Sequence, residues 1–166
     1  MFTSRNATID DIDTIRAIAQ NTWFETYKDI LSSEQADYMF EMMYSVESLK
    51  NQMINKGHQF YLAYNQDKPV GYMSIVLEED SLFHIQKIYV LPGIQKSGLG
   101  KFLLDKAFEH AGNASEDKNF SVVLNVNRYN KAVTFYQKMG MYISQEGDFE
   151  IGNGYFMNDY IMRIDF

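Results

Sequence analysis

The fold is decided by the stretch His84-Ile85-Gln86-Lys87-Ile88-Tyr89-Val90-Leu91-Pro92-Gly93-Ile94-Gln95-Lys96-Ser97-Gly98-Leu99-Gly100. Its first part has the apolar character of a β-strand, and a proline, a glycine-bearing loop and the start of a helix follow. Between Leu99 and His110, apolar residues recur at three- and four-residue spacing, which predicts an amphipathic helix. A glycine loop that enters a helix presents backbone N–H groups without partners, and the helix dipole adds partial positive charge. The stretch therefore predicts a binding site for a phosphate group.

Length and composition limit the classes of protein to which the chain can belong. The chain has 166 residues, of which 46% are hydrophobic, and this suits one compact domain over residues 1–166. No run of eighteen apolar residues occurs, and residues 1–6 lack the apolar core of a signal peptide. With no cysteine, disulfides, thiolate metal sites and a cysteine nucleophile are excluded, and no metal site is predicted. We expect a cytoplasmic protein without membrane association.

The charge balance is acidic. The chain has 15 Lys and Arg against 22 Asp and Glu, which gives a net charge of −7. Such a surface repels nucleic-acid phosphates and disfavours a role in DNA or RNA binding. It attracts small cations such as amines, although the same charge also serves simply to keep a protein in solution.

Periodicity predicts helices in the first third of the chain and mostly strands after Gly57. A short strand is expected over 4–9, followed by helices from 12 to 27, from about 33, and from 46 to Gly57. Further strands are expected over 59–64, 69–77, 82–90, 120–126, 141–151 and 155–164, with helices over 98–111 and 130–139. The turn Gly152-Asn153-Gly154 is a strong hairpin signal. Residues 112–119 are expected to form a polar connection.

Two other phosphate-binding motifs are excluded at specific residues. A dinucleotide fingerprint needs a third glycine at position 103, where the sequence has Leu. A Walker loop needs Ser or Thr after Gly100-Lys101 and a first glycine at position 95, and the sequence has Phe102 and Gln95 there.

What the stretch resembles is the acetyl-CoA site of the Gcn5-related N-acetyltransferases (GNAT). That family has a strand often ending in Val-x-Pro, followed by Gln/Arg-x-x-Gly-x-Gly/Ala at the start of a long helix. The matching residues are Val90-Leu91-Pro92 and Gln95-Lys96-Ser97-Gly98-Leu99-Gly100. Most of a second family signature, Asn-x-x-Ala-x-x-Phe-Tyr-x-Lys-x-Gly, is also present. Ala132, Phe135, Tyr136, Lys138 and Gly140 have the family spacing, and Asn130 precedes Ala132 by two residues where the signature has three.

The resemblance covers essentially the whole chain and implies its fold. This fold is an α/β domain with a mixed, mostly antiparallel central sheet of about seven strands and flanking helices. The strand at 82–90 and the strand at 120–126 splay apart and admit the cofactor. The chain would then be a single N-acetyltransferase domain that uses acetyl-CoA.

The resemblance also implies how acetyl-CoA is held. Loop amides bind the pyrophosphate, the strand backbone before the loop pairs with the pantetheine arm, and an N–H near Val90 faces the acetyl carbonyl. Lys96 and Lys101 would meet outer phosphates or remain solvated, and Asn130 would lie near the pantetheine or cap a helix. The expected cofactor-binding residues are Ile88, Tyr89, Val90, Gln95, Lys96, Ser97, Gly98, Leu99, Gly100, Lys101, Asn130 and Tyr136.

Two residues are candidates for proton transfer. In the family, a phenol at the position of Tyr136 protonates the departing thiolate, and a phenol pKa of about 10 suits that role; the alternative is a core tyrosine. Relatives that use a carboxylate base place Glu eleven residues before the Gln, and that position here is His84. An imidazole accepts a proton near neutral pH, so His84 is the candidate base, and a chain of waters is the alternative.

The helical first third of the chain is expected to bind the acetyl acceptor. The segment around Trp23, Glu25 and Tyr27 mixes aromatic and acidic residues and resembles a subgroup that includes polyamine acetyltransferases of the PaiA type. Aromatic faces and a carboxylate would hold a cation, whereas the alternative is that Trp23 and Tyr27 are core residues of an amphipathic helix.

Three functions remain open at this stage. The first is acetyl transfer from acetyl-CoA to a primary amine such as a polyamine, the second is protein or peptide N-acetylation, and the third is acyl-CoA binding without catalysis. Presence of Tyr136 favours an enzyme. The hairpin at 152–154, with the aromatic residues after it, would lie at a homodimer surface or pack in the core.

Overall fold

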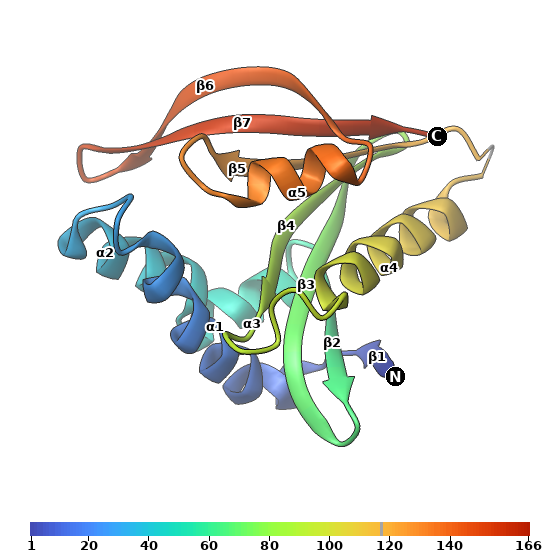
Figure 1. Ribbon diagram of the computed structural model, residues 1–166, viewed down its shortest axis with the longest axis horizontal. Helices are drawn as coiled ribbons and strands as arrows, with labels where there is room; N and C mark the ends of the chain where they lie inside the picture. The colour runs from blue at the N-terminus through green and yellow to red at the C-terminus, as the bar shows by residue number, and fades with distance from the viewer. Residues whose placement is uncertain (117) are drawn as a thin grey trace.

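The structure is a computed structural model that describes residues 1–116 and 118–166. A seven-stranded sheet is flanked by helices, as the sequence predicts (Figure 1). The elements are β1 (Phe2–Asn6), the 3-10 helix η1 (Ile9–Asp11), α1 (Ile12–Tyr27), α2 (Ser33–Tyr44), α3 (Val46–Ile54), β2 (Gln59–Asn65), β3 (Lys68–Glu79), β4 (Leu82–Val90), α4 (Leu99–Ala114), β5 (Ser121–Asn127), α5 (Ala132–Lys138), β6 (Tyr142–Gly152) and β7 (Tyr155–Asp165).

The strand order is β1-β2-β3-β4-β5-β7-β6, and every neighbouring pair is antiparallel except β4 and β5. The parallel pairing of β4 with β5 extends only from Leu82 to Ile85, so the second half of β4 has no partner on that side. In Figure 1 the two halves of the sheet diverge, with α1 and α2 on one side and α4 on the other. The predicted splayed pair of strands is thereby confirmed.

Each face of the sheet buries its own core. On one face, α4 and α5 cover apolar residues of β3, β4 and β5, and this core includes Leu103, Leu124 and Tyr136. On the other face, α1, α2 and α3 cover a core rich in aromatic residues, including Trp23 and Tyr44. Two buried faces explain why Val122–Leu124 is a continuous apolar run without the alternation of a half-exposed strand.

Gly71 on β3 lies close to both the backbone of β4 and the first turns of α4. A Cβ there would lie 2.7 Å from the carbonyl oxygen of Tyr89 and 3.3 Å from side-chain carbons of Leu99 and Leu103. Only glycine permits this approach, which fixes the first turn of α4 beside the end of β4.

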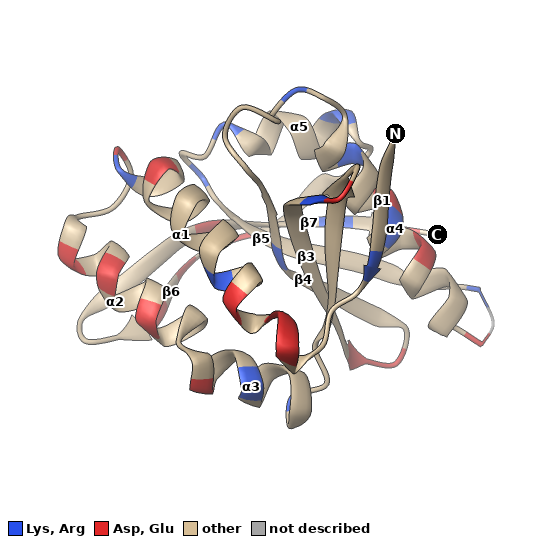
Figure 2. Ribbon diagram, turned by 90° about the horizontal axis from the view of Figure 1, so that it is seen from below, with Lys and Arg blue, Asp and Glu red and all other residues tan. Residues whose placement is uncertain are grey.

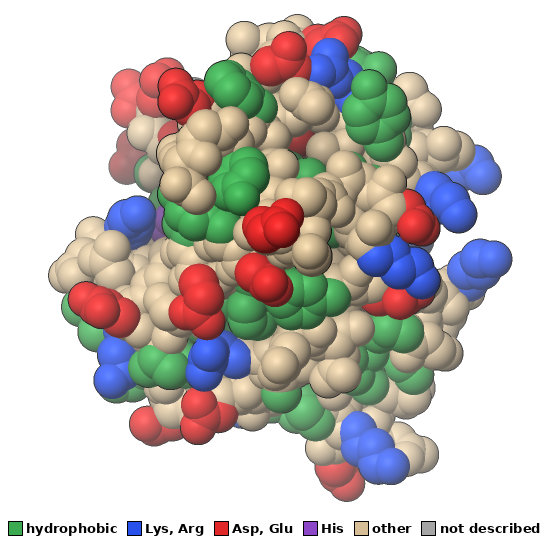
Figure 3. All heavy atoms as spheres, turned by 90° about the vertical axis from the view of Figure 1, so that its left-hand side faces the viewer, with side chains coloured by type: hydrophobic (Ala, Val, Ile, Leu, Met, Phe, Trp, Pro, Cys, Tyr) green, Lys and Arg blue, Asp and Glu red, His purple; other side chains and the backbone are tan. Residues whose placement is uncertain are grey.

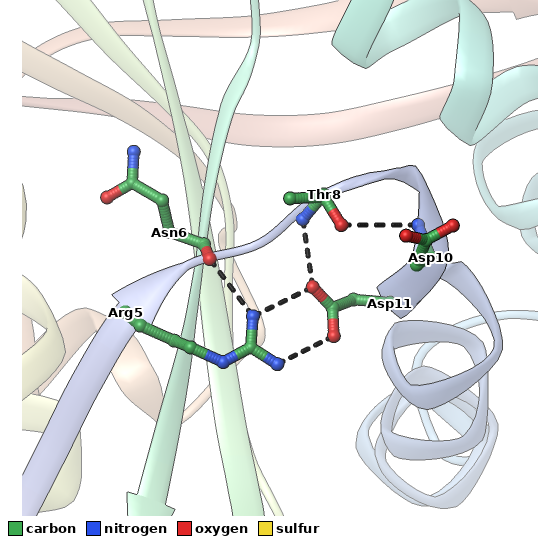
Figure 4. Close-up of polar contacts among 5 residues, drawn as sticks. All are labelled: Arg5, Asn6, Thr8, Asp10 and Asp11. Carbon is green, nitrogen blue, oxygen red and sulfur yellow. Dashed lines mark hydrogen bonds and ion pairs between the residues drawn. The ribbon is translucent and has the colours of Figure 1, made fainter.

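The N-terminus differs from the prediction. The first strand ends at Asn6 and not at Ile9, because Thr8 starts a helical turn. The Thr8 hydroxyl accepts from the amide of Asp10, and the Asp11 carboxylate accepts from the amide of Thr8 and from both terminal nitrogens of Arg5 (Figure 4). This reciprocal cap satisfies the amides that a continued strand would have paired. Arg5 and the amide of Thr8 lower the pKa of Asp11 to about 2.

Most other boundaries agree with the prediction within a few residues. The long helix continues through Gly112 to Ala114, so the connection after it is shorter than expected; Asp117 in that connection lies outside the described residues. The helix predicted over 130–139 is reduced to Ala132–Lys138. The hairpin of β6 and β7 turns at Gly152-Asn153-Gly154, where all three residues have positive φ. Among the helices described, none is long and apolar enough to cross a membrane.

Candidate active site

The candidate site lies where β4 leaves β5. Ile88, Tyr89 and Val90 pair with β3 on one side, and on the other side they lie beyond the last pair with β5. All three are half-buried. Their backbone groups on the open side are therefore available to a ligand that adds to the sheet like another strand.

A β-bulge precedes this open segment. In the pairing with β3, Ser74 lies opposite Lys87 while the next residue, Ile75, lies opposite Ile85, so Gln86 is an extra residue in β4. The bulge brings the side chains of Lys87 and Tyr89 to the face of α1–α3, while Ile88 and Val90 pack with the core under α4.

The loop after β4 leads into α4 through Gly98. Gly98 has φ +92°, and the helix it precedes has no side-chain cap. The amides of Leu99, Gly100 and Lys101 occupy the first turn, where no earlier helical carbonyl exists to accept from them. Within the loop, the amide of Ile94 donates to Leu91 and that of Ser97 to Ile94, which holds the turn in shape. This uncapped start of a helix fits the phosphate of a ligand.

The other residues predicted to hold the cofactor surround this helix start. Gln95, Lys96 and Ser97 are exposed. Lys101 is exposed and pairs with Asp105 at 2.5 Å, one turn further along α4. The Asn130 side-chain oxygen accepts from the amide of Ala132 at 2.9 Å, so its predicted alternative role in starting α5 is present in the structure.

Tyr136 on α5 is buried, with 6% of its surface exposed. Burial raises the pKa of its hydroxyl well above the usual value, and the nearby Tyr27 raises the pKa further. The phenol therefore stays protonated and keeps a proton to donate. Tyr136 also packs with Phe135 at 5.2 Å between ring centroids, so a packing role and a proton-donor role are compatible.

His84 lies in the closed part of the sheet, opposite Val123 of β5 and just before the strands part. Its Nδ1 lies 2.7 Å from Oε1 of Glu78, and Gln86 donates to the same oxygen at 3.4 Å. His84 and Gln86 thus share a carboxylate, which comes from β3. A carboxylate on Nδ1 orients an imidazole and fixes which nitrogen carries the proton. The assignment of His84 as base stays a prediction.

The residues predicted to bind the acceptor occupy two different environments. Trp23 is buried, its indole N–H donates to the carbonyl of Ala36 at 3.0 Å, and its ring lies 4.3 Å from that of Tyr27. Burial also raises the pKa of Tyr27 to about 12. Glu25 is exposed and pairs with Lys28 at 2.8 Å. Trp23 and Tyr27 belong to the core on the face of α1–α3, as the alternative interpretation holds, and Tyr27 also lies close to Tyr89 and Tyr136.

Two buried charged residues escaped the sequence-based prediction. Lys87 lies on β4 within the core under α3, and Asp159 lies on β7 beside β5. Both strands also contain other polar residues, such as Arg163 in β7 and Gln86 in β4, so the sequence carries no clear signal that Lys87 and Asp159 are buried. Lys87 was hidden because the bulge shifts the alternation of β4 by one residue.

Two shallow hollows are found elsewhere on the described surface. One of about 320 Å³ lies between β1 and the turn after β2, and one of about 450 Å³ lies between α1, Pro69 and Leu91. Neither contains a predicted site residue. The site is identified by its backbone geometry and its buried polar groups, because a gap between strands that accommodates a ligand arm need not form a rounded cavity.

The parting of β4 from β5 beside a helix start without a side-chain cap is the arrangement expected of an acyl-CoA-dependent transferase. Residues 27–158 match the family described as Acetyltransferase (GNAT) domain, and the chain belongs to this family. It is an N-acetyltransferase, and acetyl-CoA is the acetyl donor of the family.

The chain is also similar to individual members. An N-acetyltransferase of Mycobacterium tuberculosis is 25% identical over 153 residues, which cover 92% of this chain and 96% of that protein. The peptidyl-lysine N-acetyltransferase YjaB of Salmonella typhimurium is 28% identical over 100 residues, or 60% of each chain. The structure of PaiA N-acetyltransferase from Thermoplasma acidophilum in complex with coenzyme A superposes with a TM-score of 0.82. That superposition has 23% sequence identity and covers 100% of this chain and 99% of the other.

The residues present fit acetyl-CoA, which supplies an activated acetyl thioester when bound. The amides at the start of α4 suit its phosphates, and the open side of β4 suits its amide-containing arm. Donation of a proton by the buried phenol of Tyr136 to the departing thiolate stays a prediction. The chain's own contribution would then be to bind and orient the donor and to hold that proton.

Proposed function

We propose that residues 1–166 act as a single N-acetyltransferase domain that acetylates a small cationic primary amine. The observation that carries the proposal is the opening between β4 and β5, next to the uncapped start of α4. The acceptor would approach from the side of α1–α3, the helical part of the chain that is expected to bind it, and Tyr27 and Tyr89 of that side lie next to the opening.

The charge of the acceptor side supports a cationic substrate. The exposed residues of α2 include Glu34, Asp37 and Glu41, and α2 contains no Lys or Arg (Figure 2). Figure 3 views the molecule from the end where α2 and the β6–β7 turn lie. It shows acidic side chains near the middle of this face, beside hydrophobic ones. Such a surface raises the local concentration of amines. The resemblance of the segment around Trp23, Glu25 and Tyr27 to polyamine acetyltransferases of the PaiA type supports the same class of substrate.

Peptide acetylation is the second candidate, and the similarity to the peptidyl-lysine acetyltransferase YjaB favours it. The structure offers one feature against an open peptide cleft. The segment between α1 and α2 turns tightly, with the amides of Ile30 and Leu31 both donating to the carbonyl of Tyr27. Ile30 and Leu31 pack on the aromatic core and do not form an extended edge.

The test is release of free thiol from acetyl-CoA in the presence of alkylamines, diamines, polyamines and lysine-containing peptides. We expect kcat/KM to be highest for a small amine with at least one further positive charge. Higher kcat/KM for peptides would establish the second candidate. Tight coenzyme A binding without turnover of any acceptor would contradict both and identify a binding module.

A further inference from the structure

Asp159 is a buried carboxylate whose hydrogen bonding is incomplete. Only 5% of the residue is exposed. Its Oδ2 accepts from the side-chain amide of Asn125 at 3.3 Å, and its Oδ1 has no partner within the described residues. A buried carboxylate oxygen without a partner is costly, so its presence in a native fold calls for a partner such as a bound ligand, an ion or a water.

The basic residue beside Asp159 is already engaged elsewhere. Arg128 follows β5 and binds the carboxylates of Glu146 and Asp148 on β6. Its guanidinium helps to lower the pKa of Asp159, but burial outweighs this effect and raises the pKa above the usual value. Both terminal nitrogens of Arg128 are thus taken by β6, and within the described residues Asp159 makes no ion pair, while the buried Nε of Arg128 also has no hydrogen-bond partner.

The register of the strands places Asp159 at the opening. Asp159 pairs with Asn127 of β5, three residues beyond Leu124, where the pairing of β5 with β4 ends. Residues opposite each other on neighbouring strands point to the same face of the sheet, so Asp159 shares a face with Asn127. Val123, four residues before Asn127 on β5, points to that face as well, and so does His84, its partner on β4.

Contacts across the opening agree with this placement. The carboxylate of Asp159 is close enough to Tyr27 on α1 to raise the pKa of its hydroxyl. Tyr27 in turn raises the pKa values of Tyr89 on β4 and of Tyr136 on α5. The free oxygen of Asp159 thus belongs to the same group of side chains as the predicted acetyl-transfer residues, on the acceptor side.

We propose that Asp159 binds the ammonium group of the acceptor, which makes it the residue that selects cationic amines. The proposal rests on the proposed function. An ammonium has three N–H donors and a full positive charge, so it satisfies the free Oδ1 and supplies the missing counter-ion. Alcohols and neutral amides supply a hydrogen-bond donor without a positive charge, and we expect them not to bind at Asp159.

The test compares Asp159→Asn with Glu150→Gln, which removes the same charge from an exposed position on the neighbouring strand β6. For the best amine of the screen, we expect Asp159→Asn to raise KM at least about 10-fold, with KM for acetyl-CoA unchanged. We also expect its melting temperature to stay equal or to rise, because an uncompensated buried charge is removed. Glu150→Gln should leave all three quantities unchanged.

A merely structural role gives a different pattern. If Asp159 only stabilises the hairpin, the melting temperature falls and both KM values change together. That result, or an acceptor KM within about twofold of the wild type, would overturn the proposal while leaving the acetyltransferase function intact.

Equilibrium binding separates failure of this inference from failure of the proposed function. Calorimetry of spermidine and of n-butylamine with the coenzyme A complex requires no turnover. Binding to the wild type and to Glu150→Gln that is lost in Asp159→Asn supports the role of Asp159, even if no amine is acetylated. Equal binding by all three proteins contradicts it, and so does the lack of any binding to the wild type.

Discussion

Lys87 on β4 donates to the side-chain oxygen of Gln52 on α3 over 2.7 Å, and only 6% of each residue is exposed. The rings of Tyr44 and Phe60 lie 5.6 Å and 5.8 Å from the ammonium. Burial lowers the pKa of Lys87 to about 7, because the charged form loses its hydration and the neighbouring Lys56 repels it.

This lysine makes stability depend on pH. In the unfolded chain its pKa returns to 10.5, so between pH 7 and pH 10.5 the unfolded state binds more protons and stability rises with pH. Below pH 7 both states are protonated, and the cost of the buried charge is fully present. From pH 7 to pH 9.5, we expect the wild type to gain at least about 2 kcal/mol in unfolding free energy relative to Lys87→Met.

Urea unfolding at the two pH values measures this difference, and Lys50→Met on the exposed side of α3 is the control. The control should follow the wild type. Parallel stability curves for Lys87→Met and the wild type would show that Lys87 is charged throughout this range.

Tyr136→Phe removes the hydroxyl and keeps the buried ring. We expect kcat to fall about 100-fold, because the departing thiolate loses its proton donor, with KM for acetyl-CoA nearly unchanged. Steady-state kinetics of thiol release checks this. The control Phe135→Leu alters only the neighbouring ring, and it should lower the melting temperature while kcat stays nearly unchanged. An unchanged kcat in Tyr136→Phe would assign the tyrosine to packing.

Gly98→Ala tests the start of α4. Gly98 and Gly154 both have positive φ, +92° and +74°, and in both a Cβ would meet nothing within 4 Å. Because of the positive φ, and without any new steric contact, alanine should destabilise the fold by roughly 1 kcal/mol at either position, and thermal unfolding measures this loss. Only Gly98→Ala should also raise KM for acetyl-CoA, by about 10-fold, since it disturbs the amides that face the phosphates. Equal KM values in the two variants would move the phosphate site away from this turn.

His84→Ala tests the predicted base. If the imidazole accepts a proton from the amine, the pH profile of kcat/KM changes shape and its maximum falls by about 100-fold. Glu78→Gln, which leaves the imidazole but removes the carboxylate bound to it, should shift the same profile more weakly. A profile for His84→Ala that merely scales down, or does not change, would favour a chain of waters as the base.

Local signals explain what the sequence predicted well. The helix at Leu99–Ala114 and the hairpin at Gly152–Gly154 depend on nearby residues, and both were found. The first strand was predicted correctly but placed two to three residues too late, because the Thr8 cap ends strand pairing after Asn6.

Features that depend on distant partners were not predictable. The carboxylate on His84 comes from Glu78 on the preceding strand, and nothing in their spacing signals the bond. Burial of Lys87 depends on the bulge at Gln86 and on α3, thirty-five residues earlier in the chain at Gln52. The open oxygen of Asp159 depends on which partners Arg128 takes from β6.

The place of β7 between β5 and β6 has a consequence for how the protein is made. β7 is the last strand of the sequence, yet it pairs with neighbours on both sides. During synthesis, β5 and β6 leave the ribosome without the strand that joins them, and both expose unpaired edges. One half of the sheet therefore closes only after translation reaches Asp165, and a nascent chain must keep those edges apart until then.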